Sequence, residues 1–571
     1  MHDILIKNGT VFDPINNIDG EIIDIAISKG KIVDKVDESN AEVIDASNKI
    51  VLPGGVDIHS HIAGPKVNMG RLLRPEDHYR NLKPKTSVKR AGVGTSCPST
   101  FTTGYEYSEM GYTTVFEPAN PPLKMLHVID EFNDTPMIDK ACYPLFGSNW
   151  HVMEYLHDNK EDELAAYIAW TLRSVKGYAC KLVNPGGVEQ WKWGGDVEGL
   201  DVAVGNFGVT PREIVKGMCK AVQRLNLPHS IHIHANNLGM PGNYETSIET
   251  LDSMREYAKE NTNGKPNPIA HLTHVQFNTY GGTNWMNITS GAEHLAKYIN
   301  NNDHVSIDLG QVVFSDTTTM TADGPFEHKL QTLTGNRWVN ADIEAETGCG
   351  IVPIKYKKSN YIHAIMWVTG LEAALMIDDP WKVCMTTDHP NGGYFTTYPR
   401  VVTWLMSQKA REKYMEKVNK RAKSRTALES LDREYSFSDV VISTRAGTAR
   451  LLGLNDKGHL GVGADADVAV YNIDLNKIDP AIQYWKVRKA LRRADYTIKD
   501  GEIVVKDGEV VKSVPGRSYW VDSKVSTDLA KSVESEIKEK FKDYYTIQMS
   551  NYIVAEKNII NSSPITVQAE V

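Results

Sequence analysis

The chain has 571 residues, of which 41% are hydrophobic and 24% charged, and its formal net charge at pH 7 is -9. This length allows two to four domains with a large core, and the composition is that of an ordinary soluble globular protein. The negative charge argues against general affinity for nucleic acid. No apolar run approaches the roughly 18 residues of a membrane-spanning helix. The N-terminus has no signal-peptide layout, so we expect a cytoplasmic protein.

Six cysteines are scattered along the chain, at positions 97, 142, 180, 219, 349 and 384. No two of them have the C-x-x-C spacing, which argues against an iron–sulfur run and against a disulfide framework. The sequence also lacks a glycine-rich dinucleotide fingerprint. If the protein takes part in a redox process, another chain must therefore carry the electrons.

Both ends of the chain have the pattern of short strands. Residues 4–13 contain an Asn-Gly turn. Residues 465–471 and 494–501 have matching strand and turn patterns near the C-terminus. We expect residues 1–53 and 456–522 to form one small composite β-sandwich domain, with a larger domain inserted between them.

The middle of the chain, residues 54–455, alternates between strand-like and helix-like stretches. Strand patterns occur at residues 113–117, 177–183, 230–234, 269–275, 304–309 and 383–387. Helical patterns lie between them, for example at residues 211–225 and 244–261. This alternation is typical of the α/β class, and most simply of a closed (β/α)8 barrel. The active site of such a barrel lies at the C-terminal ends of its strands.

The remaining residues, 523–571, are expected to form a C-terminal helix and a tail. Leu529, Val533, Ile537 and Phe541 recur at four-residue spacing. This spacing is typical of an amphipathic helix that packs on its own protein.

A short buried strand is predicted to end in two histidines, in the stretch Leu-Pro-Gly-Gly-Val-Asp-Ile-His-Ser-His at residues 52–61. Side chains alternate faces along a strand, so His59 and His61 point the same way. Neutral imidazole is a common zinc ligand, and such a pair can hold one ion from two positions. Taken alone, the pair is more often two hydrogen-bonded histidines at a strand end.

Lys181 is a charged residue inside an otherwise apolar strand. An unmodified ammonium group is costly to bury, and burial lowers its pKa so that it becomes a nucleophilic amine. Such an amine can take up carbon dioxide, giving a carbamate that bridges two metal ions. For this residue alone, a lysine that reaches out to solvent is the simpler explanation.

Two further histidine pairs and an aspartate follow at predicted strand ends. His232 and His234 share one face of their strand. His271 and His274 are three residues apart, so we expect them to point to opposite faces, with at most one facing the barrel. Asp388 follows the last predicted strand, where a carboxylate can bind metal and move protons. Together with the features above, in this order on successive strands, these residues predict a metal site.

The stretch at residues 52–61 resembles the first-strand signature of the amidohydrolase superfamily, of the hydantoinase and dihydroorotase type. The resemblance covers nearly the whole chain and includes a late Gly-Val-Gly-Ala-Asp-Ala-Asp stretch at residues 461–467. It implies a site with two divalent metal ions, held by His59, His61, carboxylated Lys181, His234, His274 and Asp388. Histidine and carboxylate ligands favour zinc, although iron, manganese or cobalt accept a similar set.

The choice within each later histidine pair also rests on this resemblance. His234 is preferred to His232 because the residues after it resemble the His-Ala-Glu-Asn turn of the hydantoinase type, although Asn236 stands where those relatives carry Glu. His274 is preferred to His271 because it begins a His-Val pair like that of a later strand in the family.

Four stretches resemble, more closely, the family of A subunits of formylmethanofuran dehydrogenases. They are the long insertion at residues 66–90 and the motifs at residues 180–187, 270–277 and 386–393. This resemblance implies a larger redox complex, with a molybdenum or tungsten B subunit like a formate dehydrogenase and iron–sulfur subunits as partners. It implies reversible condensation of formate with the amine of methanofuran, in the reduction of CO2 to methane, with Asp388 as the proton acceptor. The alternative is a free-standing cyclic amidase of the hydantoinase or dihydroorotase type.

The insertion at residues 66–90 holds eight Lys or Arg residues and two acids. It follows the first barrel strand, so we expect it to rise from the catalytic face. The resemblance implies a long anionic substrate, and arginine can hold carboxylates through two parallel hydrogen bonds. Arg71 and Arg74 are therefore candidates for substrate binding. A solvated loop or a docking surface for a partner protein explains the insertion equally well.

Overall fold

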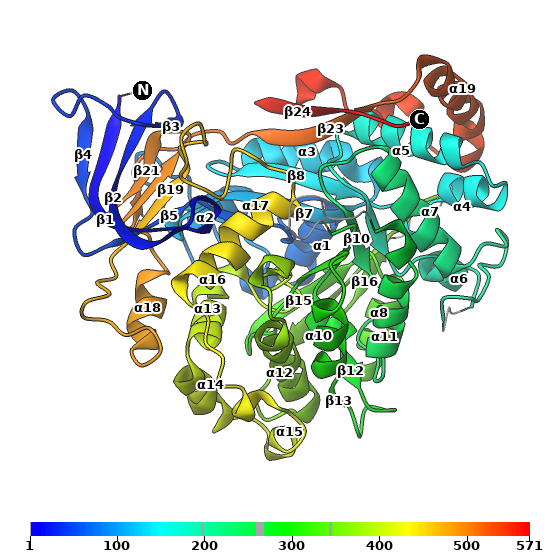
Figure 1. Ribbon diagram of the computed structural model, residues 1–571. Helices are drawn as coiled ribbons and strands as arrows, with labels where there is room; N and C mark the ends of the chain where they lie inside the picture. The colour runs from blue at the N-terminus through cyan, green and yellow to red at the C-terminus, as the bar shows by residue number, and fades with distance from the viewer. Residues whose placement is uncertain (1, 196–198, 259–267, 342–344) are drawn as a thin grey trace.

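The structure is a computed structural model that describes residues 2–195, 199–258, 268–341 and 345–571. A barrel of parallel strands and surrounding helices occupies its middle, with a separate sheet on one side (Figure 1). The largest group of buried apolar side chains lies in and around this barrel. None of the helices that the structure describes combines the length and apolar character needed to span a membrane.

Eight parallel strands make up the barrel within the described residues. In order around it, they are β6 (Gly55–Asp57), β7 (Tyr112–Asn120), β8 (Asp139–Pro144), β9 (Lys181–Val183), β10 (Ile231–His234), β11 (Ala270–Leu272), β14 (Val305–Asp308) and β18 (Val383–Cys384). Parallel bridges from Leu145 to Lys181 and from Ser60 to His389 close the circle. The (β/α)8 barrel predicted from the sequence is confirmed. One closing bridge contains the predicted ligand Lys181, and the other joins Ser60, between His59 and His61, to His389, which follows Asp388.

Helices connect the strands and cover the outside of the barrel. α7 (Pro211–Arg224) begins at a capping box, in which Thr210 and Glu213 bond each other's backbone N–H groups, and Pro211 occupies its first turn. The other helices between β6 and β19 (Val468–Tyr471) are α1 (Pro65–Leu73), α2 (Thr100–Glu109), α3 (Met125–Asp134), α4 (Trp150–His157), α5 (Glu161–Val175), α6 (Gly187–Lys192), α8 (Tyr244–Asp252), α9 (Val275–Asn278), α10 (Ala292–Asn300), α11 (Gly324–Thr334), α12 (Tyr361–Met376), α13 (Tyr398–Met406), α14 (Gln408–Met415), α15 (Lys420–Lys423), α16 (Phe437–Val441) and α17 (Gly447–Leu451).

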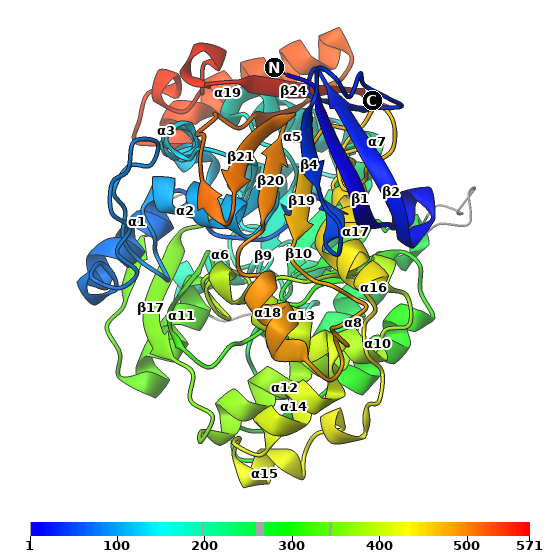
Figure 2. The ribbon, with the colours of Figure 1, turned by 90° about the vertical axis from the view of Figure 1, so that its left-hand side faces the viewer.

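Strands from both ends of the chain form one sheet beside the barrel. Its order is β22 (Glu509–Val510), β21 (Glu502–Lys506), β20 (Tyr496–Lys499), β19 (Val468–Tyr471), β5 (Ile50–Pro53), β1 (Ile4–Asp13), β2 (Ile18–Ser28) and β3 (Lys31–Val33), with β4 (Glu42–Asp45) paired to β1. The two ends meet where β5 runs antiparallel to β19, with Leu52 opposite Ala469. Figure 2 shows the blue N-terminal and orange C-terminal strands in this sheet, the composite β-domain that the sequence predicts.

The C-terminal part of the chain adds to the barrel as well. β23 (Ser518–Lys524) begins inside the range expected for the β-sandwich, but it pairs with β8 of the barrel and with β24 (Ser562–Gln568). It does so because Tyr519 and Val521 are buried against aromatic side chains of the barrel wall. Between β23 and β24 in the sequence, α19 (Thr527–Tyr544) packs on α5, as the four-residue apolar spacing predicts. The expected tail is thus partly a strand.

An antiparallel sheet that the sequence did not predict is inserted between β14 and β18. It contains β15 (Asp316–Thr321), β16 (Val339–Ala341) and β17 (Cys349–Lys355), and α11 packs on β17. α1 lies against the same strands, where Val67 is buried with Met320 and Ile351. We call β15, α11, β16 and β17 the cap.

A buried group of charges fastens the composite sheet to the barrel. Lys457 Nζ lies 2.7 Å from a carboxylate oxygen of Asp139 on β8 and 2.7 Å from one of Asp467. Lys499 on β20 lies 3.1 Å from the same Asp139 carboxylate. Asp139, Asp467 and Asp500 offer oxygens close enough together for a cation, but the two lysines already supply positive charge there.

Replacing Lys457 with Met should lower the free energy of unfolding by about 3–5 kcal/mol, because it leaves the buried carboxylates without one of their two cations. Denaturant titration of the purified protein measures this loss. Lys7→Met is the control, since Lys7 pairs with Glu38 at the surface and its loss should barely move the midpoint. Equal midpoints for the two variants would show that the buried group does not hold the sheet.

Candidate active site

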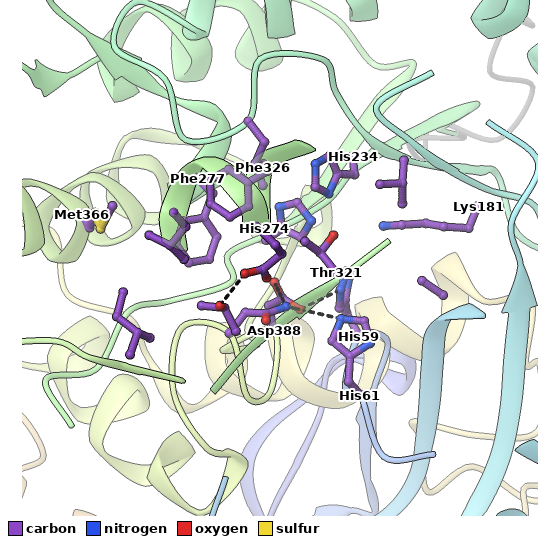
Figure 3. Close-up of a pocket in the computed structure, with 18 of the residues that line it drawn as sticks. His59, His61, Lys181, His234, His274, Phe277, Thr321, Phe326, Met366 and Asp388 are labelled. Atoms are coloured by element: carbon purple, nitrogen blue, oxygen red, sulfur yellow. Dashed lines mark hydrogen bonds and ion pairs between the residues drawn. The ribbon is translucent and has the colours of Figure 1, made fainter. Parts of the chain in front are cut away.

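A pocket lies at the C-terminal ends of the barrel strands, between the barrel and the cap (Figure 3). It encloses about 540 Å³ of empty space, part of which is open to solvent. The six residues predicted to bind metal all line it: His59, His61, Lys181, His234, His274 and Asp388. The cap contributes Thr319, Thr321, Phe326, Glu327, Leu330 and Ile354 to its wall. The fold therefore brings together side chains from five barrel strands that are far apart in the sequence.

Three of these side chains converge on one point. The Nε2 atoms of His59 and His61 lie 3.0 and 3.2 Å from Oδ1 of Asp388, and Figure 3 shows the three side chains meeting. Their potential ligand atoms all lie within 4.8 Å of one another. This is the arrangement that a single ion bound by a same-face histidine pair requires.

Glu117, on β7, sets the orientation of His61. Its Oε1 lies 3.0 Å from Nδ1 of His61 and 2.6 Å from Nζ of Lys66. Burial raises the pKa of Glu117, but the neighbouring Lys66 and His61 outweigh burial and lower that pKa to about 2. The carboxylate is ionised and accepts a hydrogen bond from Nδ1, so Nε2 of His61 keeps its lone pair.

Asp308, on β14, orients His59 in the same way. Its Oδ2 lies 3.0 Å from Nδ1 of His59 and 3.2 Å from Nε2 of His271. Burial raises the pKa of Asp308, but the neighbouring histidines, His59 above all, hold it well below its usual range. Nδ1 of His59 donates to this carboxylate, so Nε2 is the ring atom directed at Asp388.

Two imidazole lone pairs and a carboxylate oxygen repel one another at about 3 Å unless a positive charge lies among them. A proton on His59 is one such charge: burial lowers the pKa of His59, but the carboxylates of Asp308 and Asp388 raise it to about 9. A divalent cation satisfies all three groups at once, and nitrogen and carboxylate donors suit zinc. The residues present therefore fit a metal ion.

His234, His274 and Lys181 form another part of the pocket wall. Nε2 of His234 lies 3.1 Å from Oδ2 of Asp323. Burial lowers the pKa of His234, so its ring is neutral, donates through Nε2 and keeps a lone pair on Nδ1. Thr273 Oγ1 lies 2.8 Å from Nε2 of His274 and 3.2 Å from Nζ of Lys181. Burial lowers the pKa of Lys181 to about 7, which leaves much of the amine neutral near neutral pH.

The backbone is left-handed at both His274 and Asp388, with φ values of 36° and 50°. Residues other than glycine hold such a conformation at a cost of about 1–3 kcal/mol each, and they cluster at functional sites. Gly310 makes room for the turn at His274, because a Cβ at this position would lie 2.3 Å from Cβ of His274.

The turn at His274 corrects one sequence prediction. His271 and His274 were expected to point to opposite faces, with at most one facing the barrel, and this is wrong. β11 ends at Leu272, so the alternation of a strand stops before His274. The left-handed residue then places His274 on the pocket wall, while His271 contacts Asp308 in the barrel interior.

His232 and His271 occupy the barrel interior and are not among the residues that line the pocket. Their rings stack with centroids 4.7 Å apart, and Nε2 of His232 lies 3.0 Å from Nδ1 of His59. In each of the two later histidine pairs, one member therefore lies in the barrel interior and the other, His234 or His274, lies on the pocket wall. Metal binding by His234 and His274 stays a prediction, in agreement with their place in the pocket.

The structure does not bring Arg71 and Arg74 to the pocket. Arg71 donates to the backbone O of Pro98 at 2.8 Å and to Glu131 at 2.8 Å. Arg74 is buried and donates to the backbone O of Thr317 on β15 at 2.6 Å. Both guanidinium groups fasten the insertion to neighbouring segments, so substrate binding by them stays a prediction that their positions do not support.

Three carboxylates that orient the predicted ligands were not predicted from the sequence: Glu117, Asp308 and Asp323. Glu117 and Asp308 carried a signal similar to the one that pointed to Lys181, a single charge within an otherwise uncharged strand. Asp323 gave no such signal, because it lies in the cap, whose position depends on packing between distant segments.

Residues 42–505 match the model of the amidohydrolase family. The chain belongs to this family. It is 49% identical over 557 residues to Protein FwdA of Methanocaldococcus jannaschii, covering 97% of each chain. It is 34% identical over 512 residues to the A subunit of the formyltransferase/hydrolase complex Fhc of Methylorubrum extorquens, covering 87% of each. The resemblance found in the sequence is confirmed, and this amidohydrolase is FwdA-like.

Solved structures agree with the family assignment. A chain of the formyltransferase/hydrolase complex (FhcABCD) from Methylorubrum extorquens, crystallised with methylofuran, matches with a TM-score of 0.88 and 30% identity, covering 99% of both chains. A D-hydantoinase matches with a TM-score of 0.50 and 15% identity, covering 91% of this amidohydrolase and 99% of the hydantoinase, which shows a shared fold alone. Family membership and the group of His59, His61 and Asp388 together support the use of a divalent metal.

Replacing Glu117 with Gln should lower metal affinity or activity about 10- to 100-fold, the usual effect of losing a hydrogen-bond partner of a ligating histidine. Competition with a chromophoric chelator measures the affinity. Glu346→Gln is a matched control, because Glu346 is also a buried carboxyl but bonds Tyr545 and Tyr552 outside the pocket. Metal affinity that drops equally in both variants would argue against a specific role for Glu117.

Proposed function

We propose that this amidohydrolase condenses formate with the primary amine of methanofuran, giving formylmethanofuran and water, and that it also catalyses the reverse hydrolysis. It would act as the A subunit of a formylmethanofuran dehydrogenase. The observation that carries the proposal is the convergence of His59, His61 and Asp388 in a chain 49% identical to Protein FwdA. The methylofuran bound in the related FhcABCD complex supports a substrate of the same kind.

Two divalent ions, for which zinc is our first choice, would polarise the formate oxygens as Lewis acids when bound. We propose that six residues hold them: His59, His61, Lys181, His234, His274 and Asp388. Lys181 would do so as a carbamate, formed when its neutral amine attacks carbon dioxide and loses a proton. The pKa of about 7 supports this reaction, because the attacking form is well populated at neutral pH.

Asp388 is the proposed general base and acid. It accepts a proton from the attacking amine and returns one to the departing hydroxide, and the same transfers run backwards in hydrolysis. Nδ2 of Asn391 lies 2.9 Å from both of its oxygens and fixes the carboxylate plane. Burial raises the pKa of Asp388, but His59 and His274 hold it well below its usual range, so the carboxylate is ionised.

Formation of an amide from formate in water is uphill, so a high local concentration of formate is needed. We propose that it comes from a molybdenum or tungsten B subunit like a formate dehydrogenase, with iron–sulfur subunits supplying electrons in a cytoplasmic complex. The related Fhc protein belongs to a complex of several subunits, which supports an assembly of this kind. Co-purification from native extract with a metallopterin protein tests the assembly.

A free-standing cyclic amidase is the alternative function, with the same metals activating hydroxide for ring opening. The likeness to D-hydantoinase extends only to the fold, at 15% identity, whereas two relatives above 30% identity are FwdA and the Fhc protein. Turnover of hydantoin or dihydroorotate by the purified protein without partners would favour this alternative.

Asp388→Asn should keep the fold and reduce the rate of formylmethanofuran hydrolysis about 100- to 10,000-fold, the usual contribution of general acid–base catalysis. The release of formate by the metal-loaded wild type and variant measures it. A loss of less than about tenfold would count against a catalytic role for Asp388, and an inactive wild type would count against the proposed substrate.

Lys181→Ala should lower the metal content and abolish hydrolysis, because the site loses an anionic ligand. Elemental analysis of the folded protein measures the first effect and formate release the second. Lys140→Ala is the matched control: burial also lowers the pKa of Lys140 to about 7, but this lysine donates to the backbone O of Thr135 outside the pocket. Full metal content and full rate in Lys181→Ala would refute the carbamate.

A further inference from the structure

Glu327, on α11 of the cap, is a fully buried carboxyl in the pocket that the proposed chemistry does not use. It lines the same pocket as the six predicted ligands. Gly350 on β17 gives it space, because a Cβ at Gly350 would lie 2.5 Å from Cβ of Glu327. Oε1 of Glu327 has no hydrogen-bond partner in the described part of the chain. A buried polar atom without a partner is costly, so this oxygen points to a ligand that supplies one.

The other carboxyl oxygen, Oε2, contacts a hydroxyl group of the cap. Oγ1 of Thr319 is 2.9 Å from Oε2 of Glu327 and 2.8 Å from the backbone O of Val352. The single hydroxyl hydrogen of Thr319 can be donated to only one of these two acceptors. When Val352 receives it, the contact with Glu327 is a hydrogen bond only if Oε2 carries a proton and donates it. Oε1 carries no proton in either arrangement and accepts hydrogen bonds.

The surroundings of Glu327 favour this neutral form. Among the described residues, Glu327 is bonded through Oε2 to Thr319 and has no ion pair with a cationic side chain. Burial raises its pKa well above the ordinary value, and the negative charges of Asp323 and Asp388 raise it further. Apolar side chains, including Phe326 and Leu330, line the same wall.

We propose that Glu327 is a substrate-binding residue whose Oε1 accepts a hydrogen bond from the reacting nitrogen of the substrate. This inference rests on the proposed function, in which the substrate nitrogen is an amine in one direction and a formamide in the other. Both forms carry an N–H donor, whereas ionised formate carries none, so the nitrogen is the partner that an acceptor oxygen selects. The cap thereby holds the nitrogen side of the substrate, and the barrel holds the groups that act on the formyl side.

Two variants of similar size separate this role from that of a base or a packing residue. Glu327→Gln keeps the carbonyl oxygen and gives Thr319 an N–H donor, so kcat and KM for formylmethanofuran should stay within about threefold of wild type. Glu327→Met removes the acceptor, so kcat/KM should fall about 10- to 100-fold. The pH profile, the metal content and the thermal midpoint should stay as in wild type for the Gln variant.

Each opposite result overturns the inference. An equal loss in Glu327→Gln and Glu327→Met would make Glu327 an ionised base, and an unaffected Met variant would show that it does not touch substrate. Infrared spectra at neutral pH test the proton without any turnover: wild type should show a carboxylic acid C=O band that Glu327→Gln lacks. If wild type fails to hydrolyse formylmethanofuran, the proposed function and the substrate contact fall together, while the infrared band still decides the proton assignment.

Discussion

One buried carboxylate, Asp308 on β14, ties together the strand ends that form the pocket. Its Oδ2 bonds the rings of His59 and His271, and its Oδ1 accepts from the backbone N of His274 at 2.7 Å and from the hydroxyl of Thr386 at 3.3 Å. His59 follows β6, His271 and His274 lie in and after β11, and Thr386 follows β18. A charge buried this deeply persists only when several groups bond it. The closure of the barrel and the order of the site therefore depend on the same few hydrogen bonds.

The barrel and the cap contribute different chemistry to the pocket. The barrel supplies ionised carboxylates and imidazole rings, an arrangement whose negative charge a divalent cation balances. The cap residues that line the pocket are apolar side chains, two threonines and Glu327 in its proposed neutral form. A metal that activates formate and a wall that positions an amine need these two environments side by side. The boundary between barrel and cap is thus where the proposed reaction takes place.

The barrel and most of the candidate ligands could be predicted because they depend on local patterns. His59 and His61 share a direction through the two-residue period of extended chain, and Lys181 stood out as a charge in an apolar strand. His274 could not be placed in this way, because its left-handed backbone breaks the period. The cap was missed for a related reason, since its three short strands are stabilised by α1 and by each other rather than by a strong pattern of their own. Arg71 looked free for substrate because its partner Glu131 lies far along the chain.

Anomalous diffraction from crystals of the metal-loaded protein tests most directly whether buried carboxylates direct the first histidine pair at Asp388. We expect a metal peak bonded to Nε2 of both His59 and His61 and to the carboxylate of Asp388. A metal bound instead by His232 and Asp308 in the barrel interior, or by Nδ1 of His59 or His61, would contradict the orientation described above.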